Sequence, residues 1–167
     1  MDVETAIQTR RTHKQYAREP VDRTTLAELL ELARWAPNHH LTQPWRFRVL
    51  GPETLARLKA AAGDKEAAKL DRAPTLVIAS AALTGDPLQD EEDLHATAAA
   101  VYAVLLAATA RGFASYWRTP AALRDRDICA LLGLPPDERV VALIHLGRPV
   151  GNPPAKERAP TPVEFLP

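Results

Sequence analysis

The chain has 167 residues, a length typical of one domain with a sizeable core. Its 46% hydrophobic and 25% charged residues are ordinary for a globular protein, and 21 basic side chains balance 21 acidic ones. The balanced charge argues against a nucleic-acid or acidic-lipid partner, and the single cysteine, Cys129, excludes internal disulfides and cysteine-ligated clusters.

No stretch of the sequence has the features of a signal peptide or a membrane span. The first residues are polar and include acids, with no apolar run. The longest uncharged alanine-rich stretch, residues 96–110, is shorter than the roughly 18 apolar residues that a membrane helix needs. We therefore expect a cytoplasmic protein.

Two helices are predicted before the first strand. Asp2 and Asp22 are suited to cap helices that begin directly after them. The second helix carries Leu26, Leu29, Leu30 and Ala33 on one face, which predicts a buried stripe, and Pro37 ends it.

The rest of the chain alternates strands and helices. The run Trp45–Leu50 alternates apolar residues with arginines, as a half-buried strand does, whereas the continuous apolar run 75–81 suits a central strand. A long helix, apolar nearly all round, is predicted from residue 90 to 112 and should be buried in the core or at a subunit interface. Further elements are a helix at 52–63, strands at 113–117 and 139–147, and a helix around 125–133.

Residues 148–167 hold six of the fifteen prolines, so they form neither a helix nor an inner strand. Composition alone is compatible with a disordered segment. Val163, Phe165 and Leu166 favour instead an extended arm that packs on a second subunit. We thus divide the chain into a single α+β domain, residues 1–147, and a Pro-rich C-terminal arm, residues 148–167.

Several catalytic motifs are missing. The seven glycines form neither GxGxxG nor a Walker A loop, and neither serine lies in GxSxG. His39 and His40 are adjacent and have no flanking acid, so we expect no metal site. Cys129 lies on an apolar helix face and is expected to pack in the core.

A basic cluster offers a way to bind phosphate without a glycine loop. In the segment RRTHKQY, the cations Arg10, Arg11 and Lys14 surround the hydroxyl of Thr12. This pattern suits a basic helix end that complements the helix dipole, but forked Arg donors also match phosphate oxygens. A second pair, Lys156 and Arg158, could converge on the same anion.

Two further segments could line a pocket for a flat ring. The loop WAPNHHLTQPWRF contains Trp35 and His39, and a later segment contains Trp117, Arg118 and Thr119. A flat ring system needs aromatic or apolar walls and a few donors at its edge. Together with a phosphate clamp this points to a mononucleotide-type cofactor, although such a Trp-rich loop is more often core packing.

The chain resembles the FMN-dependent nitroreductases from about Val3 to Leu166. The resemblance rests on RRTHKQY, PVDRTTLAELLELARWAP, QPWRF, GFASYWRTPAAL, LGLPPDERVVALIHLGRP and KERAPTPVEFL. It is greatest with the compact bacterial subgroup of NAD(P)H nitroreductases. Asn38 and Leu41 depart from the Ser and Asn that many larger members have in the loop after Ala-Pro, so a flavin contact is not carried over to Leu41.

The resemblance implies a nitroreductase-like α+β fold, with a mixed, mostly antiparallel sheet, in an intertwined homodimer that exchanges its C-terminal arms. Two FMN molecules would lie at the dimer interface. Arg10, Arg11 and Thr12 would contact the FMN phosphate, and Trp35 and His39 would approach the ring from the partner chain. Trp117, Arg118 and Thr119 would line its other side.

The implied activity is ping-pong hydride transfer from NADH or NADPH, through N5 of FMN, to a nitroaromatic, a quinone or a similar small oxidant. The flavin carries the chemistry, so no catalytic side chain is expected. The alternatives are a non-catalytic protein that binds, stores or senses FMN, and an interaction domain without a cofactor.

Overall fold

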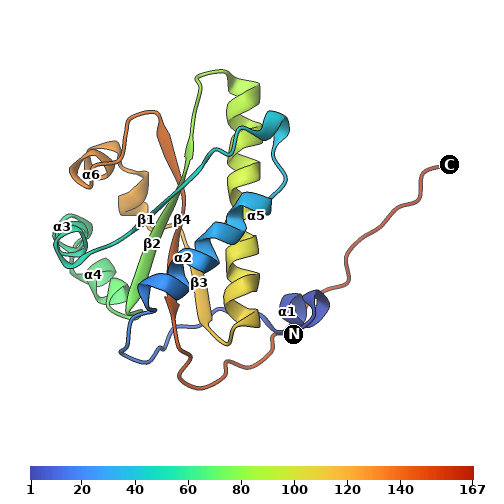
Figure 1. Ribbon diagram of the computed structural model, residues 1–167, viewed down its shortest axis with the longest axis horizontal. Helices are drawn as coiled ribbons and strands as arrows, with labels where there is room; N and C mark the ends of the chain where they lie inside the picture. The colour runs from blue at the N-terminus through green and yellow to red at the C-terminus, as the bar shows by residue number, and fades with distance from the viewer.

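A four-stranded sheet forms the centre of the computed structural model, which describes all 167 residues (Figure 1). The strands lie in the order β1-β2-β4-β3, and every neighbouring pair is antiparallel. The one parallel contact is an isolated bridge between Thr12 and Ser115. The α+β class and the mostly antiparallel sheet are confirmed. The strands are β1 (Trp45–Val49), β2 (Thr75–Ala82), β3 (Ala114–Arg118) and β4 (Glu138–Gly147).

Helices cover both faces of this sheet. In Figure 1, α3, α4 and α6 lie on one side, and α2 and α5 lie on the other. The α-helices are α1 (Val3–Thr9), α2 (Arg23–Glu31), α3 (Pro52–Ala62), α4 (Asp64–Leu70), α5 (Pro87–Ala110) and α6 (Arg126–Leu131). Three short 3₁₀ helices complete the list: η1 (Leu32–Trp35), η2 (His39–Leu41) and η3 (Ala121–Arg124).

The predicted caps are present in the structure. The carboxylate of Asp2 accepts a hydrogen bond from the backbone N–H of Thr5 at 2.9 Å, and Asp22 does the same for Thr25 at 2.9 Å. Gly63 ends α3 with φ of 77°, in the left-handed region that glycine adopts without strain. The sequence pattern missed α4, which begins directly after Gly63 and is short and mostly polar.

The core has a layer on each face of the sheet. On the α5 side, Val77 and Ile144 pack with Val101 and Leu105 of the helix. On the opposite side, leucines of α3, α4 and η3 pack on the alternate residues of β2 and β4. The predicted stripe on α2 is confirmed, because Leu26, Leu29 and Ala33 are buried and Leu30 is half-buried.

Helix α5 is buried on one side only. Residues such as Ala100 and Val104 face the rest of the chain, whereas Tyr102 is exposed. By length and composition α5 could cross a membrane, and 44% of its most apolar 18-residue window is buried. Core helices of globular proteins have the same properties, and α5 packs along β1, β2, β3 and β4. Its exposed side leaves room for the predicted subunit contact.

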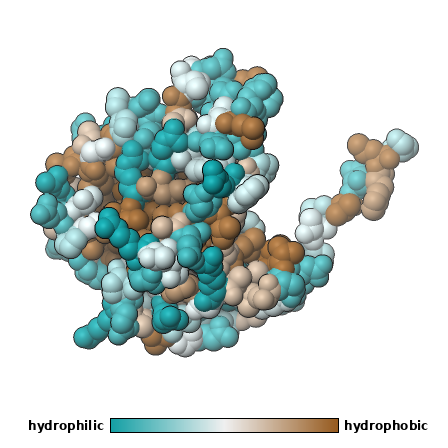
Figure 2. Space-filling model, viewed as in Figure 1, coloured by the Kyte–Doolittle hydropathy of each residue, from teal (hydrophilic) through white to brown (hydrophobic).

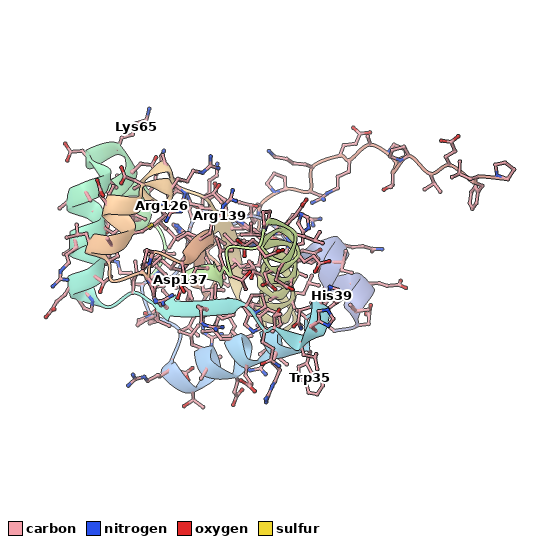
Figure 3. All side chains as sticks on the ribbon, turned by 90° about the horizontal axis from the view of Figure 1, so that it is seen from above. Trp35, His39, Lys65, Arg126, Asp137 and Arg139 are labelled. Carbon is pink, nitrogen blue, oxygen red and sulfur yellow. The ribbon has the colours of Figure 1, made fainter.

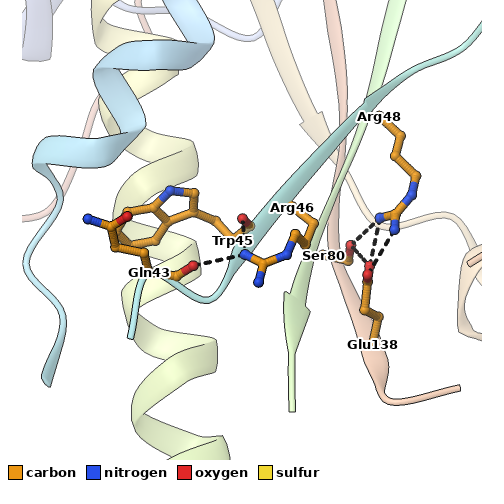
Figure 4. Close-up of polar contacts among 6 residues, drawn as sticks. All are labelled: Gln43, Trp45, Arg46, Arg48, Ser80 and Glu138. Atoms are coloured by element: carbon orange, nitrogen blue, oxygen red, sulfur yellow. Dashed lines mark hydrogen bonds and ion pairs between the residues drawn. The ribbon is translucent and has the colours of Figure 1, made fainter. Parts of the chain in front are cut away.

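An ion pair ties the edge strand β1 to β4 across β2. Figure 4 shows Arg48 of β1 reaching over Ser80 to the carboxylate of Glu138, with Nη–Oε distances of 2.6 and 2.8 Å. The hydroxyl of Ser80 donates to the same carboxylate at 2.6 Å. The predicted alternation in β1 holds for Trp45 and Phe47, which pack on the core, but it is wrong at Val49, which is exposed near the end of this edge strand.

After Gly147 the chain forms no further helix or strand and leaves the body as an extended arm (Figure 1). Near its start the arm is held by a bridge between Tyr16 and Pro149 and by hydrogen bonds to residues 15 and 17. Farther out, Val163, Phe165 and Leu166 are largely exposed, and Figure 2 shows apolar side chains on the arm away from the body. The arm is extended, and its packing on a second subunit stays a prediction.

Candidate functional site

Both ends of the chain line one groove of about 780 Å³. Residues 10–15 form one side, and residues 150–158 of the arm form the other. The groove contains five cationic side chains and no acidic one; its cations are Arg10, Arg11, Lys14, Lys156 and Arg158. Lys156 and Arg158 thus border the same groove as the N-terminal cluster, and so does Thr12; their convergence on one anion stays a prediction.

Backbone contacts hold the two sides of this groove. The segment after α1 runs beside β3, where Thr12 bridges Ser115 and the N–H of His13 donates to the carbonyl of Ser115 at 3.2 Å. The arm then returns along the same segment, and the N–H of Ala17 donates to the carbonyl of Arg148 at 3.0 Å. The cluster is therefore positioned by the sheet edge and is not a free loop.

The cations of the groove differ in their freedom to bind a ligand. The Nη1 of Arg11 donates to the carbonyls of Gln8 at 2.5 Å and Arg10 at 3.1 Å, so this guanidinium caps the end of α1. The side chains of Arg10, Lys14, Lys156 and Arg158 make no hydrogen bond or ion pair within the chain. Arg11 thus has the helix-end role that the sequence left open, and the other four cations remain available to an anion.

An aromatic wall closes one part of the groove. The ring of Tyr116 lies 5.7 Å from the ring of His145 on β4, and His145 is fully buried. Burial, with the nearby Arg118 and Arg72, lowers the pKa of His145 from 6.5 to about 4. The imidazole is therefore neutral at pH 7. Tyr116 was not among the predicted site residues, because only the register of β3 turns it toward the groove.

The segment Trp117–Thr119 does not border this groove. Trp117 packs on the α5-side core, and Arg118 lies on the opposite face, where its Nη2 donates to Glu66 of α4 at 2.7 Å. The hydrogen bonds from Lys69 and Arg118 lower the pKa of Glu66. The Nη1 of Arg118 is buried without a partner in the chain. Thr119 borders a second cavity on another side of the molecule.

The aromatic loop lies apart from the groove within one subunit. Figure 3 shows Trp35 and His39 at the side of the molecule, and Trp35 is 80% exposed. The Nδ1 of His39 lies 2.7 Å from the carboxylate of Glu92, and its ring stacks on His40 with centroids 3.9 Å apart. These side chains border neither the basic groove nor the cavity beside Thr119, so they can reach the basic groove only across a subunit contact.

The loop after His39 has an unusual backbone. His40, Leu41 and Gln43 all have positive φ, at 51°, 53° and 44°. Non-glycine residues in this region are strained, and such strain often occurs at functional sites. The side-chain oxygen of Asn38 accepts from the N–H of Gln43 at 2.9 Å and helps to hold this conformation.

Comparisons with known proteins agree with these features. The sequence model described as "Nitroreductase family" matches residues 7–68 and 62–148. YfhC of Bacillus subtilis, provisionally named an NAD(P)H nitroreductase, is 28% identical over 170 residues, covering 92% of this chain and 88% of YfhC. YdjA of Escherichia coli K12, with the same provisional name, is 27% identical over 181 residues, covering 99% of this chain and 98% of YdjA.

Solved structures show the same fold. A nitroreductase-like family protein from Bacillus cereus superposes with a TM-score of 0.87 at 24% identity, covering 96% of this chain and 92% of that one. A protein from Desulfovibrio desulfuricans, provisionally named a nitroreductase and crystallised with FMN, has a TM-score of 0.81 at 25% identity, covering 95% and 92%.

Proposed function

Because this chain belongs to the nitroreductase family, we propose that it is an FMN-dependent NAD(P)H oxidoreductase that reduces nitroaromatic, quinone or similar small oxidants. The observation that carries the proposal is the groove in which Arg10, Thr12, Lys14, Lys156 and Arg158 meet. The crystallised relative with FMN and the provisional NAD(P)H nitroreductase names of YfhC and YdjA support it.

The side chains in the groove fit the phosphate of FMN. A phosphate monoester carries nearly two negative charges at pH 7 and has several oxygen acceptors. Arg10, Lys14, Lys156 and Arg158 have no acidic partner in the chain, and the hydroxyl of Thr12 can donate one more hydrogen bond. A glycine loop is not needed, because side chains supply the donors.

When FMN is bound, it supplies the electron carrier between a nicotinamide and the oxidant. The chain's own residues bind and orient this cofactor. The cations hold its phosphate, and Tyr116 forms an aromatic wall of the same groove. His145 behind Tyr116 is neutral, so it adds no charge beside the five cations. No side chain of the chain is required to transfer a proton in this proposal.

We propose further that two subunits complete the site. Trp35 is too exposed to be a core residue of a single chain, and Val3, Ile7 and Tyr102 are apolar side chains exposed on α1 and α5. The arm carries three more exposed apolar residues beyond the groove. We propose that these exposed apolar side chains pack against the second subunit. In the homodimer, Trp35 and His39 would approach the flavin ring of the partner subunit.

Trp117, Arg118 and Thr119 have a supporting role in this proposal. Arg118 is anchored by Glu66 and its Nη1 is free, so the end of β3 is held in place while one donor remains. Thr119 directly follows β3 and is exposed. We propose that this strand end lies beside the flavin ring and that the backbone there, rather than the indole of Trp117, is its contact.

The test is the absorption spectrum of the purified protein, followed by anaerobic mixing with NADH or NADPH. The proposal predicts the flavin bands and their bleaching when nicotinamide is added. A yellow protein whose bands bleach no faster with nicotinamide than without it would be a non-catalytic FMN-binding protein. A protein that stays colourless after incubation with FMN would be an interaction domain.

A further inference from the structure

A second cavity, of about 900 Å³, lies at the end of the sheet opposite the basic groove. It is formed by β4, η3, α6 and the N-terminal half of α5, and it shares no residue with the groove. Pockets of this size hold small organic ligands. None of the roles proposed above uses the interior of this cavity, although Thr119 at the end of β3 lies on its border.

The cavity lies against an open part of the sheet. Strand β4 pairs with β3 only from Leu143 to Gly147, so residues 138–142 have a neighbouring strand on one side alone. The pairing with β2 shifts between Ala79 and Ser80, which leaves Val141 without a partner in the register. Bulges of this kind often occur beside binding sites, because they turn side chains and free backbone polar groups.

Apolar side chains form part of the walls of this cavity. Leu123 and Leu134 belong to the core on the α3 side, and Leu94 comes from α5. Pro120 and Val140 add further rigid or branched surface. Such walls favour a flat, apolar ligand body, because its burial removes hydrocarbon surface from water.

The charged residues around the cavity select an anion. Arg124, Arg126 and Arg139 line it, and none of the three forms an ion pair within the chain. Figure 3 labels Arg126 and Arg139. The two lining carboxylates are Asp127 and Glu138, but Glu138 is already held by Arg48 at 2.6 and 2.8 Å. The positive charge is therefore in excess.

Among the three arginines, Arg124 and Arg139 have the greater freedom. The Nη1 of Arg126 donates to the carbonyl of Pro136 at 2.9 Å, which ties this side chain to the loop before β4. Arg124 and Arg139 make no side-chain hydrogen bond within the chain and are exposed to the solvent at the cavity. A carboxylate can thus accept forked hydrogen bonds from either of them.

We propose that this cavity binds a small aromatic carboxylate, with the ring against the apolar walls and the carboxylate at Arg124 and Arg139. That this aromatic carboxylate is also the oxidant of the enzyme rests on the proposed function, whereas its binding in the cavity does not. The site would make the enzyme prefer acidic aromatic oxidants over neutral ones of the same size.

The experiment is calorimetric titration of the purified protein, without nicotinamide, using 4-nitrobenzoate and its neutral counterpart nitrobenzene. We expect 4-nitrobenzoate to bind more tightly. Arg139→Gln and Arg124→Gln should each weaken 4-nitrobenzoate binding about five- to tenfold, the effect of losing one partly exposed charged hydrogen bond, and leave nitrobenzene unchanged. Arg57→Gln, on the exposed surface of α3, is the matched control and should bind both compounds as the wild type does.

A variant that fills the cavity distinguishes the contribution of the apolar walls to binding from that of the arginines. Ala130→Trp places a large side chain at an exposed position of the lining and should weaken binding of both compounds. Equal affinity for the two compounds in the wild type would overturn the proposal, and so would loss of 4-nitrobenzoate binding in Arg10→Ala but not in Arg139→Gln. An Arg139→Gln enzyme impaired in NADPH binding alone would also overturn it, since the arginines would then serve the dinucleotide.

The titration does not depend on turnover. A protein that binds 4-nitrobenzoate in this pattern but is not reduced by NADH or NADPH would keep the site and lose the proposed function. A protein that is reduced by NADH or NADPH but binds the two compounds equally would support the proposed function and rule out the carboxylate site.

Discussion

The hydroxyl of Thr42 donates a hydrogen bond to the carboxylate of Asp93 at 2.6 Å, which fastens the strained loop after η2 to helix α5. Asp93 is only 2% exposed, and Thr42 is its one side-chain partner. The loop keeps three residues at positive φ, so this contact helps to hold a conformation that the backbone alone would not favour.

Thr42→Val should therefore destabilise the protein. It replaces the donor with a methyl group of similar size and leaves a buried carboxylate unpaired, at a cost of about 1–3 kcal/mol in the free energy of unfolding. Urea denaturation measures this loss, and Thr42→Ser, which keeps the hydroxyl, is the control. If the valine and serine variants unfold at the same urea concentration, the hydrogen bond contributes nothing to stability.

Arg10→Ala should weaken FMN binding about ten- to a hundredfold, because it removes a charged hydrogen bond worth roughly 1.5–3 kcal/mol. Arg10 is the better target of the two adjacent arginines, since Arg11 already caps α1. Fluorescence titration of the apoprotein with FMN gives the dissociation constant. Arg57→Ala, outside both cavities, should leave it unchanged. An unaltered constant in Arg10→Ala would place the phosphate elsewhere.

Arg48→Met should destabilise the sheet by about 2–4 kcal/mol, because it leaves the carboxylate of Glu138 buried without its cation. Glu138 is 6% exposed at its side chain, whereas Arg48 keeps a third of its surface in water, so the loss should be below that of a fully buried pair. Thermal unfolding measures the change. The double variant with Glu138→Gln should recover part of the loss; a double variant less stable than Arg48→Met would contradict this account.

Stability should fall in acid partly through His145. Burial raises the cost of protonating it and lowers its pKa from 6.5 to about 4. Above pH 6.5 the imidazole is neutral in both the folded and the unfolded state, so His145 does not lower the free energy of unfolding there. As the pH falls from 6.5 toward 4 the unfolded state takes up the proton first, and up to about 3 kcal/mol is lost.

The measurement is urea denaturation of the wild type and His145→Leu at a series of pH values. Carboxylates contribute to acid sensitivity in both proteins, so the difference between the two curves isolates the imidazole. That difference should change between pH 6.5 and 4 and be constant above. A constant difference across the whole range would show that His145 has an ordinary pKa.

Removal of the arm should impair both assembly and cofactor retention. Deletion of residues 151–167 eliminates Lys156 and Arg158 together with the exposed apolar tip, and should give a monomer or an aggregate that retains flavin poorly. The double variant Phe165→Asp, Leu166→Asp keeps both cations, so it should lose the subunit contact but retain more flavin than the deletion variant does. Sedimentation velocity and flavin absorbance report the two effects. A stable, flavin-loaded dimer of the deletion variant would contradict the role of the arm.

The sequence predicted those features that depend on neighbouring residues or on chemical type. Asp2 and Asp22 cap helices because a cap lies within a few residues of the N–H groups that it satisfies. The apolar run of β2 predicted a central strand because both its faces are covered. Lys156 and Arg158 were predicted to bind the same anion as Arg10 because all three are cations, not because of any pattern in neighbouring residues.

Other features depend on contacts that no local pattern contains. No local pattern shows that Glu66, 52 residues away, accepts a hydrogen bond from the guanidinium of Arg118. The register of β3 turns Tyr116 toward the groove, and the bulge at Val141 arises only when β4 pairs with β2. The exposure of Val49 reflects its place on an edge strand, which alternation of residue types does not reveal.

The groove joins residues 10–15 to residues 150–158, so it exists only while the arm stays attached to the folded body. All four strands lie before residue 148, and none of them depends on the arm for its pairing. Under the proposed function, a protease that cuts near Gly151 would therefore release the flavin while the sheet stays intact.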